Sequence, residues 1–374
     1  MGHPLLSHRI SRRKALTLAG IGAATLPLTA CVTNSSAQNP AAITIGYVPI
    51  ACTAPLIVAD ALGHFKANGL TIKLRKYAGW ADLWSAYATG DIHIAHMLSP
   101  MPIAINAGVT NGTRPTELVF TQNTNGQAIV LGKKHENTVT TADDFRGMTI
   151  GIPFEFSVHL LLLRDFLTAN NVDPDRDLEL RLLRPSDMIA QLQIGTIDGF
   201  IGPEPFIQRA VATKAGFIFT LTKNLWEDHP CCSIAVAKDW KAAHPTETAG
   251  IIAALAAGAE AAGDHDHAPD IAHTLGQEKY LNQPEKLFIP ALKEPDRINF
   301  GTPTNPTAIT WMATQISRWN LGGTPPAWDD ATLIQLAESV LPTNTPRGTN
   351  TLTINGKPFD ANLPTAGYKQ VTPR

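Results

Sequence analysis

Apolar and polar positions along the chain follow two alternating periods, which predict a regular succession of strands and helices. Residues 43–48 read ITIGYV, in which β-branched and other apolar residues recur at every second position, and they predict a strand. Residues 55–68 place apolar side chains at helical spacing, and Gly69 predicts the end of that helix. The folded part of the chain is therefore expected to begin near residue 43.

The same two periods continue over most of the chain. They predict strands over 71–76, 92–96, 127–133, 148–152, 178–183 and 197–201, helices over 80–89, 101–107, 157–170, 186–194 and 205–214, and a helical, alanine-rich region over 245–276. Alternation of this kind indicates βαβ units, so we expect an α/β fold of mixed, mostly parallel sheets with helices on both faces. After residue 341 the sequence is rich in Pro, Thr and Asn, and a tail over 342–374 is expected to wrap the surface.

The first 42 residues differ in character from the rest. A pair of arginines, Arg12 and Arg13, precedes an apolar stretch over 15–28 that is too short to span a bilayer, which takes about 20 apolar residues. The pair resembles a twin-arginine export signal, and the tetrad LTAC ending at Cys31 resembles a lipobox. We expect a signal peptide over 1–30, lipidation of Cys31 and a flexible tether over 31–42. The alternative is a cleaved secretory peptide with an unrelated cysteine.

Length and charge narrow the classes of function. About 330 folded residues exceed the size of one core, so two lobes are expected. Four of the 30 Lys and Arg lie in residues 1–30, which leaves 26 against 32 acidic residues, a net charge of −6. This balance argues against binding of nucleic acid. The chain has no Gly-x-Ser-x-Gly, His-Glu-x-x-His or glycine-rich phosphate motif, which argues against common enzyme classes.

One short unit occurs twice. Residues 84–95 and 188–200 each read as a helix, a glycine and then a strand that begins with Asp91 or Asp198. The unit resembles one that recurs in each lobe of periplasmic substrate-binding proteins. Two copies about a hundred residues apart predict one copy in each lobe.

An ordered series of further motifs resembles the nitrate- and bicarbonate-binding proteins of ABC importers. The series comprises GYVP at 46–49, APLIVA at 54–59, GHFKANGL at 63–70, AHMLSPMP at 95–102, NGQAI at 125–129, HLLLLR at 159–164, IDGFIGPEP at 197–205 and DHP at 228–230. The resemblance implies a two-lobed periplasmic binding protein of type II, with lobe 1 over 43–127 and 229–341 and lobe 2 over 128–228.

The same resemblance implies a function and its partners. The protein is expected to be a monomeric, non-enzymatic binding protein of the periplasm that needs no cofactor. It is expected to hold a small solute in the cleft between its lobes and to deliver it to the permease and ATPase of an ABC transporter. A lipid on Cys31 is expected to anchor it to the membrane.

Four residues correspond to pocket positions of the family or to its hinge. Trp80 at a strand-to-helix junction offers an indole N–H, Gln127 offers an amide, and His159 lies in the first turn of a helix, where the helix dipole favours an anion. The alternatives are a core or lobe-surface aromatic for Trp80, an ordinary strand amide for Gln127 and an N-terminal capping or surface histidine for His159. Glu204, between two prolines, either repels anions, binds a cation or has a structural role near the hinge.

The chain departs from the family at Cys231-Cys232. Nitrate-binding relatives carry a lysine where Cys232 stands, and loss of that charge puts nitrate in doubt as the ligand. A neutral solute or a soft metal then becomes admissible, because thiolates favour soft ions. The alternative is that both are small buried residues that happen to be cysteine.

Three other hypotheses remain. The histidines at 265, 267 and 273 form a weak metal motif, and a solvated helix junction explains them better. An enzyme on the same fold, similar to a pyrimidine-precursor synthase with a cysteine-rich segment, is the alternative to a binding protein. A ligand sensor is a third reading, although the export signal argues against a cytoplasmic partner.

The export signal leads to a first prediction. Cys31→Ser removes the lipidated thiol, so the protein should appear in the soluble periplasmic fraction or remain unprocessed. Fractionation of cells and mass spectrometry of the N-terminus measure both outcomes. Unchanged membrane association with residues 1–30 still attached would contradict lipidation.

Overall fold

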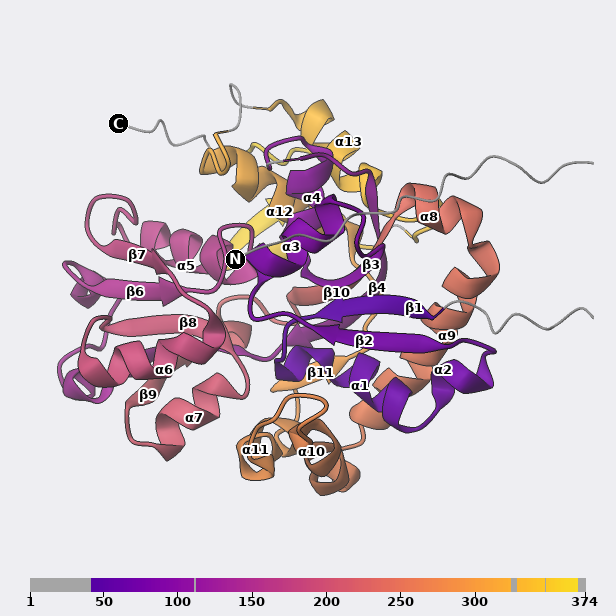
Figure 1. Ribbon diagram of the computed structural model, residues 1–374. Helices are drawn as coiled ribbons and strands as arrows, with labels where there is room; N and C mark the ends of the chain where they lie inside the picture. The colour runs from indigo at the N-terminus through magenta and orange to yellow at the C-terminus, as the bar shows by residue number, and fades with distance from the viewer. Residues whose placement is uncertain (1–41, 111, 324–327, 347, 369–374) are drawn as a thin grey trace, which may run out of the picture. The chain divides into compact units, whose positions relative to one another are not determined.

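Two mixed β-sheets organise the chain in the computed structural model, which describes residues 42–110, 112–323, 328–346 and 348–368 (Figure 1). The predicted export signal, Cys31 and most of the tether lie outside the described residues. Within the described segments, no helix has both the length and the apolar character needed to cross a membrane.

The larger sheet has six strands in the order β11-β4-β10-β3-β1-β2. Its members are β1 (Ile43–Tyr47), β2 (Ile72–Lys76), β3 (Ile94–Leu98), β4 (Thr116–Asn125), β10 (Pro230–Ala237) and β11 (Ile298–Phe300). β1 pairs in parallel with β2 and β3, whereas β10 runs antiparallel to both β3 and β4. The sheet is thus parallel at one edge and antiparallel at the other.

The smaller sheet has five strands in the order β7-β6-β8-β5-β9. They are β5 (Gln127–Gly132), β6 (Thr149–Ile152), β7 (Glu179–Leu182), β8 (Gly199–Pro203) and β9 (Gly216–Leu221). β6 pairs in parallel with β7 and β8, and β5 is antiparallel to β8 and β9. A separate hairpin near the C-terminus consists of β12 (Thr351–Ile354) and β13 (Lys357–Asp360).

Helices follow most of the parallel strands. They are α1 (Ala54–Ala61), α2 (His64–Ala67), α3 (Trp80–Ala88), α4 (Pro100–Asn106), α5 (Val158–Ala169), α6 (Pro185–Ile194), α7 (Phe206–Ala212), α8 (Lys238–Ala243), α9 (Pro245–Ala262), α10 (Ala268–Gly276), α11 (Ile289–Lys293), α12 (Pro306–Arg318) and α13 (Asp330–Ser339). Helices α5, α6 and α7 contact the smaller sheet, and α3, α4 and α9 contact strands of the larger one (Figure 1). This arrangement confirms the predicted α/β fold class.

The structure corrects four details of the prediction. Antiparallel pairings are more numerous than expected among the described strands, because β4, β9 and β10 were not predicted from the sequence. The helix predicted over 55–68 is two helices, since Gly63 has a left-handed backbone with φ of 76°. The helical region over 245–276 is interrupted between α9 and α10. The C-terminal segment forms a hairpin with buried Ile354 and Phe359 rather than only a surface tail.

Two buried ion pairs connect parts of the chain that are far apart in sequence. Arg297, just before β11 of the larger sheet, lies 2.8 Å from Glu204, just after β8 of the smaller sheet. Arg318, at the end of α12, lies 2.7 Å from Asp165 on α5, and Asn355 of the hairpin donates to the same carboxylate at 2.6 Å. All four charged residues are buried. A buried charge must be paired, so these contacts fix how the connected elements meet.

We therefore predict a large loss of stability on removal of one partner. Arg318→Met should lower the free energy of unfolding by about 3–5 kcal/mol, because it leaves Asp165 buried without a counter-charge. Arg75, whose pair with Asp91 is about half exposed, supplies a matched control: Arg75→Met should cost about 1 kcal/mol or less. Urea denaturation of both variants measures the difference. Equal losses would contradict a dominant role for the buried pair.

Candidate functional site

The carboxyl ends of strands from both sheets meet at one place. β1 leads into a short 3-10 turn, η1 (Ala51–Thr53), and the backbone N–H of Ala51 donates to the carbonyl oxygen of Glu204, which follows β8, at 2.9 Å. In open parallel sheets, ligands bind at this edge because loops and helix N-termini present backbone donors there. The residues that follow the strands are therefore the candidates for a binding site.

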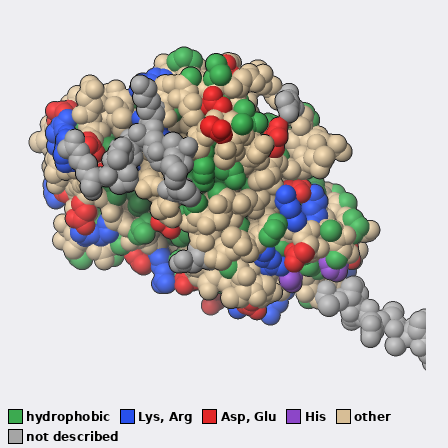
Figure 2. Space-filling model, turned by 90° about the horizontal axis from the view of Figure 1, so that it is seen from above, with side chains coloured by type: hydrophobic (Ala, Val, Ile, Leu, Met, Phe, Trp, Pro, Cys, Tyr) green, Lys and Arg blue, Asp and Glu red, His purple; other side chains and the backbone are tan. Residues whose placement is uncertain are grey.

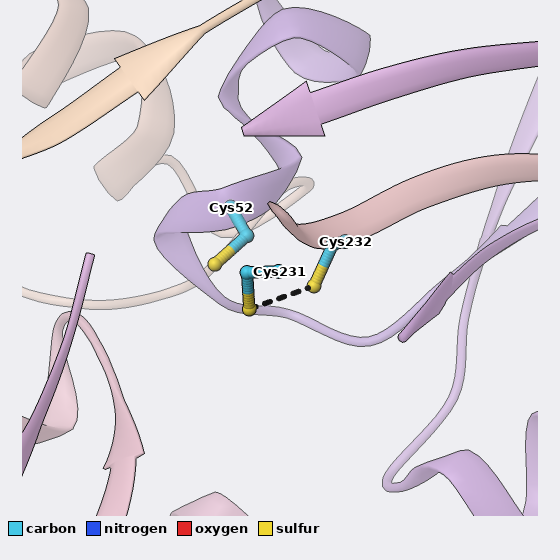
Figure 3. A group of neighbouring side chains, drawn as sticks. All are labelled: Cys52, Cys231 and Cys232. Atoms are coloured by element: carbon cyan, nitrogen blue, oxygen red, sulfur yellow. Dashed lines mark hydrogen bonds between the residues drawn. The ribbon is translucent and has the colours of Figure 1, made fainter. Parts of the chain in front are cut away.

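Three thiols gather at this place (Figure 3). Cys52 comes from η1, and Cys231 and Cys232 are neighbours on β10; all three Sγ atoms lie within 4.8 Å of one another and all three residues are buried. Adjacent residues of a regular strand point to opposite faces of the sheet. The pairing of β10 with β4 shifts register on both sides of Cys232, and this bulge accompanies an approach of the two Sγ atoms to 3.5 Å.

The three thiols shift one another's pKa. Burial acts to raise the pKa of Cys52, but hydrogen bonds from Cys231, Cys232 and the amide of Gln127 lower that pKa well below the ordinary range. Burial raises the pKa of Cys231 and Cys232 well above their ordinary value. Cys52 is therefore the most acidic of the three thiols.

Gln127, the first residue of β5, links this cluster to the smaller sheet. Its Nε2 lies 3.9 Å from Cys52 Sγ and also donates to the carbonyl of Asn125. The hydroxyl of Thr222 donates to the Gln127 carbonyl at 3.0 Å and lies 2.9 Å from His229 Nε2. The Thr222 hydroxyl has a single proton, which it donates to the backbone carbonyl of Gln127. The hydroxyl oxygen therefore accepts from Nε2–H of His229, and Nδ1 of this neutral ring carries no proton.

His159 is the second residue of α5, whose N-cap Ser157 accepts from the N–H of Leu160 at 3.1 Å. Its ring is completely buried, and neither ring nitrogen has a hydrogen-bond partner among the described residues. Burial, with a smaller contribution from His229, lowers the pKa of His159 to about 3. The imidazole is therefore neutral and offers one donor and one acceptor.

Trp80 begins α3 directly after Gly79, whose backbone is extended. The indole is 1% exposed, and its Nε1 has no hydrogen-bond partner in the described part of the chain. Its neighbour Asp82 pairs with Arg184, the N-cap of α6, at 3.1 Å. Trp80 therefore lies where a helix of the larger sheet meets a helix of the smaller one. In the part of the chain that the structure describes, no hydrogen bond links Trp80 to the thiol cluster.

Glu204 uses both carboxylate oxygens within the protein. Oε1 accepts from Arg297 and Oε2 accepts from the backbone N–H of Gln208 at 3.2 Å. Burial raises the pKa of Glu204 to about 7, although Arg297 acts in the opposite direction. These contacts favour a structural role of Glu204 near the hinge over direct binding of a cation.

The structure thus places Gln127 beside the thiol cluster that contains Cys232. His159 is linked to this group only by the electrostatic effect of His229 on its pKa. Three further residues of this region were not expected from the sequence: Cys52, Thr222 and His96. The ring of His96 is buried on β3, and both its nitrogens lack a partner among the described residues. The position of Cys52 just after the first strand was the available signal. A cavity of about 340 Å³ is lined by Trp84, Met101, Phe154 and Glu155, but by none of the predicted ligand residues.

The histidines near residue 265 have ordinary partners. His267 and His273 are exposed and pair with Asp264 and Glu285, and His265 contacts the carbonyl of Leu292. Among the described residues, the thiol cluster is the only group of three or more His, Cys, Asp or Glu close enough to share a metal ion.

Comparison with known sequences assigns the chain to a family. Residues 36–276 match the profile of the NMT1-like family, and this match covers more than half of the chain. The chain belongs to the NMT1-like family.

Relatives of this family member include transport proteins. The chain is 33% identical over 303 residues to the bicarbonate transport ATP-binding protein CmpC of Synechocystis sp., covering 74% of the chain but only 45% of CmpC. It is 29% identical over 327 residues to the nitrate/nitrite binding protein NrtA of Synechococcus elongatus, covering 76% and 74%. The chain thus spans about half the length of CmpC.

A solved structure shares the fold. The periplasmic nitrate-binding protein NrtA of Synechocystis PCC 6803 superposes with a TM-score of 0.81 at 20% identity, covering 87% of this chain and 97% of that one. The two-lobed fold of periplasmic binding proteins, which the sequence predicted, is thereby confirmed. The boundaries of the two lobes stay a prediction.

The buried histidines generate a prediction about pH. Burial lowers the pKa of His96, His159 and His229 to about 3, so each takes up a proton only on unfolding between about pH 3 and 6.5. The unfolded state binds more protons there, and these groups make stability fall as pH falls through that window. His96→Gln should reduce the pH slope of unfolding free energy by about 1 kcal/mol per pH unit between pH 5 and 6.

Urea denaturation at several pH values measures this slope. Glu204, with its raised pKa, acts in the opposite sense between about pH 4.5 and 7, but its contribution is common to both proteins and cancels in the comparison. A slope identical to that of the wild type would show that His96 is not held neutral by burial.

Proposed function

We propose that this protein is a non-enzymatic solute-binding component of an ABC importer, which captures a small solute between the elements of its two sheets. One observation carries the proposal: among the residues that the structure describes, buried side chains from both halves of the chain present polar atoms without hydrogen-bond partners. Trp80 Nε1 comes from the part that contains the larger sheet, and the two ring nitrogens of His159 come from the part that contains the smaller one.

The cost of such atoms supports a polar ligand. A buried donor or acceptor that is left unsatisfied costs about 1–3 kcal/mol, and native proteins rarely keep several. A small solute with both acceptors and donors could bond to the indole N–H of Trp80 and to both ring nitrogens of the neutral His159. The amide of Gln127, already bonded to the Asn125 carbonyl, contributes at the edge of this set.

The charges near the site bear on the class of solute. The histidines are neutral, and the buried arginines, Arg297 and Arg318, are each paired with a carboxylate. Cys232 supplies no positive charge where nitrate-binding relatives carry lysine. The solute is therefore held by hydrogen bonds rather than by an ion pair. A site without a positive charge binds a nitrate- or bicarbonate-like anion only weakly and suits a related small polar molecule better.

The relatives support the transport role and the location. Their names describe nitrate and bicarbonate transport, and one of them is a periplasmic binding protein. We place this protein in the periplasm as a monomer, exported by a twin-arginine signal over 1–30 and tethered through a lipid on Cys31. Its partners are then the permease and ATPase of the transporter, not nucleic acid. On the face seen in Figure 2, acidic and basic side chains are interspersed.

Solute capture implies relative movement of the two halves. We propose lobe 1 over 43–127 and 229–341 and lobe 2 over 128–228, with the crossovers after β4 and before β10 acting as the hinge. The pair between Glu204 and Arg297 lies beside this hinge and links β8 to β11. The pair between Asp165 and Arg318 joins α5 of lobe 2 to α12 of lobe 1 and limits how far the lobes separate.

The proposal predicts how variants bind. A thermal-shift screen of nitrate, nitrite, bicarbonate, cyanate, sulfonates and heterocycles identifies a solute, since one present at a hundredfold its Kd stabilises the fold by about 2.7 kcal/mol. His159→Ala should then weaken binding of that solute by about 1.5–3 kcal/mol in titration calorimetry.

Cys232→Lys should raise the affinity for nitrate, because it restores the charge that the relatives carry.

His273→Ala serves as the matched control, because His273 is an exposed histidine that pairs with Glu285. It should bind as the wild type does. Wild-type affinity in His159→Ala would remove His159 from the site, and no gain of nitrate binding in a folded Cys232→Lys variant would show that the relatives' anion pocket does not transfer to this chain. A screen in which no solute stabilises the protein would contradict the proposed function itself.

A further inference from the structure

The thiol cluster formed by Cys52, Cys231 and Cys232 has a geometry that solute binding does not require. Its sulfurs come from two separate segments, lie within 4.8 Å of one another and are fully buried (Figure 3). Metal–sulfur bonds of about 2.3 Å in a trigonal plane need sulfurs about 4 Å apart. The three sulfurs lie within 4.8 Å of one another, and those of Cys231 and Cys232 are 3.5 Å apart. A metal ion therefore needs little movement of the backbone to bind all three.

The local backbone is shaped for this approach. Cys231 and Cys232 would point to opposite faces of a regular strand, yet the bulge at this point of β10 brings their sulfurs to 3.5 Å. The N–H of Ser99 holds the carbonyl of Cys231 at 2.9 Å, and Asn123 faces Cys232 across the pairing with β4. Bulges of this kind commonly re-aim side chains at functional sites.

We propose that Cys52, Cys231 and Cys232 form a three-coordinate site for a thiophilic monovalent metal ion of the Cu(I) class. The number of sulfurs selects the class. Structural Zn²⁺ sites take four protein ligands, and no His, Cys, Asp or Glu among the described residues supplies a fourth within reach of the three sulfurs. Soft thiolates favour Cu(I), which accepts three-coordinate thiolate sets.

Metal binding at this cluster is coupled to loss of thiol protons. Thiolates are the metal ligands, so each thiol that becomes a ligand releases its proton to solvent. The buried arginines Arg297 and Arg318 are each paired with a carboxylate rather than with these sulfurs.

The metal site and the proposed solute site share Cys232, and both adjoin Gln127. Gln127 Nε2 lies 3.9 Å from Cys52 Sγ and sits at the end of β5. Neither His159 nor Trp80 belongs to the group of sulfur ligands. Binding of the ion and binding of the solute are therefore separable by experiment.

The test uses the full chain carrying Cys31→Ser, so that the thiol cluster supplies all the cysteines. The reduced protein is titrated with Cu(I) in competition with the chromogenic chelator bicinchoninate, both as folded protein and after refolding in the presence of Cu(I). The expected result is one Cu(I) withdrawn per chain, with the luminescence of a Cu(I)–thiolate centre. Refolding with the metal fills the site even if the folded protein admits the ion slowly.

Three further variants on this background locate the site. Cys52→Ser, Cys231→Ser and Cys232→Ser should each weaken Cu(I) binding at least tenfold, while circular dichroism reports whether each is folded. Ser233→Ala is the matched control, because Ser233 is buried on β10 next to Cys232 and has no thiol. It should bind Cu(I) as the parent does.

Several outcomes overturn the site. The site is rejected if the protein does not withdraw Cu(I) from the chelator under either condition, or if the serine variants bind Cu(I) as tightly as the parent. It is also rejected if the protein binds Zn(II) as tightly as Cu(I). The thermal-shift screen run on the same samples separates the two proposals. Solute binding without Cu(I) binding rejects only the metal site, and Cu(I) binding without any solute rejects only the proposed function.

Discussion

A buried polar group must find a partner, and this requirement governs how the two sheets of the protein meet. Where Glu204 follows the smaller sheet and Arg297 precedes the larger one, each charge finds the other at 2.8 Å. Asp165 and Arg318 do the same between α5 and α12. Each of these charges, left alone in the interior, would cost several kcal/mol. The interface between the sheets is therefore specific rather than merely apolar.

Several buried polar groups lack a hydrogen-bond partner among the described residues. Trp80 and His159 of the candidate site are among them, and so is His96. Because burial keeps the imidazole neutral, the site offers hydrogen bonds without charge.

Part of this structure could be predicted from sequence, and the division has physical reasons. The parallel strands β1, β2, β6 and β7 and most helices after them follow the expected periods to within one or two residues at their ends. β10 reads PCCSIAVA and is buried along its whole length, so it has no alternation to detect. β4 reads TELVFTQNTN, a polar strand whose burial depends on its neighbours. Local pattern cannot reveal either strand.

The site shows the same division. Gln127, His159, Trp80 and Cys232 were named because their positions match a family pattern, whereas Cys52 has no such match and joins the cluster only when β1 and β10 enter one sheet. The pairing of Glu204 with Arg297, 93 residues apart, was likewise invisible in the sequence. Contacts of this kind depend on tertiary structure, which one-dimensional periods do not encode.

The central claim is that the protein holds a small solute and returns it unchanged. The most direct test loads the protein with the solute that stabilises it, removes free solute by rapid gel filtration, denatures the complex and analyses what is released by mass spectrometry. The account predicts close to one molecule of chemically unaltered solute per chain. Release of a converted product would contradict it and would favour an enzyme on this fold.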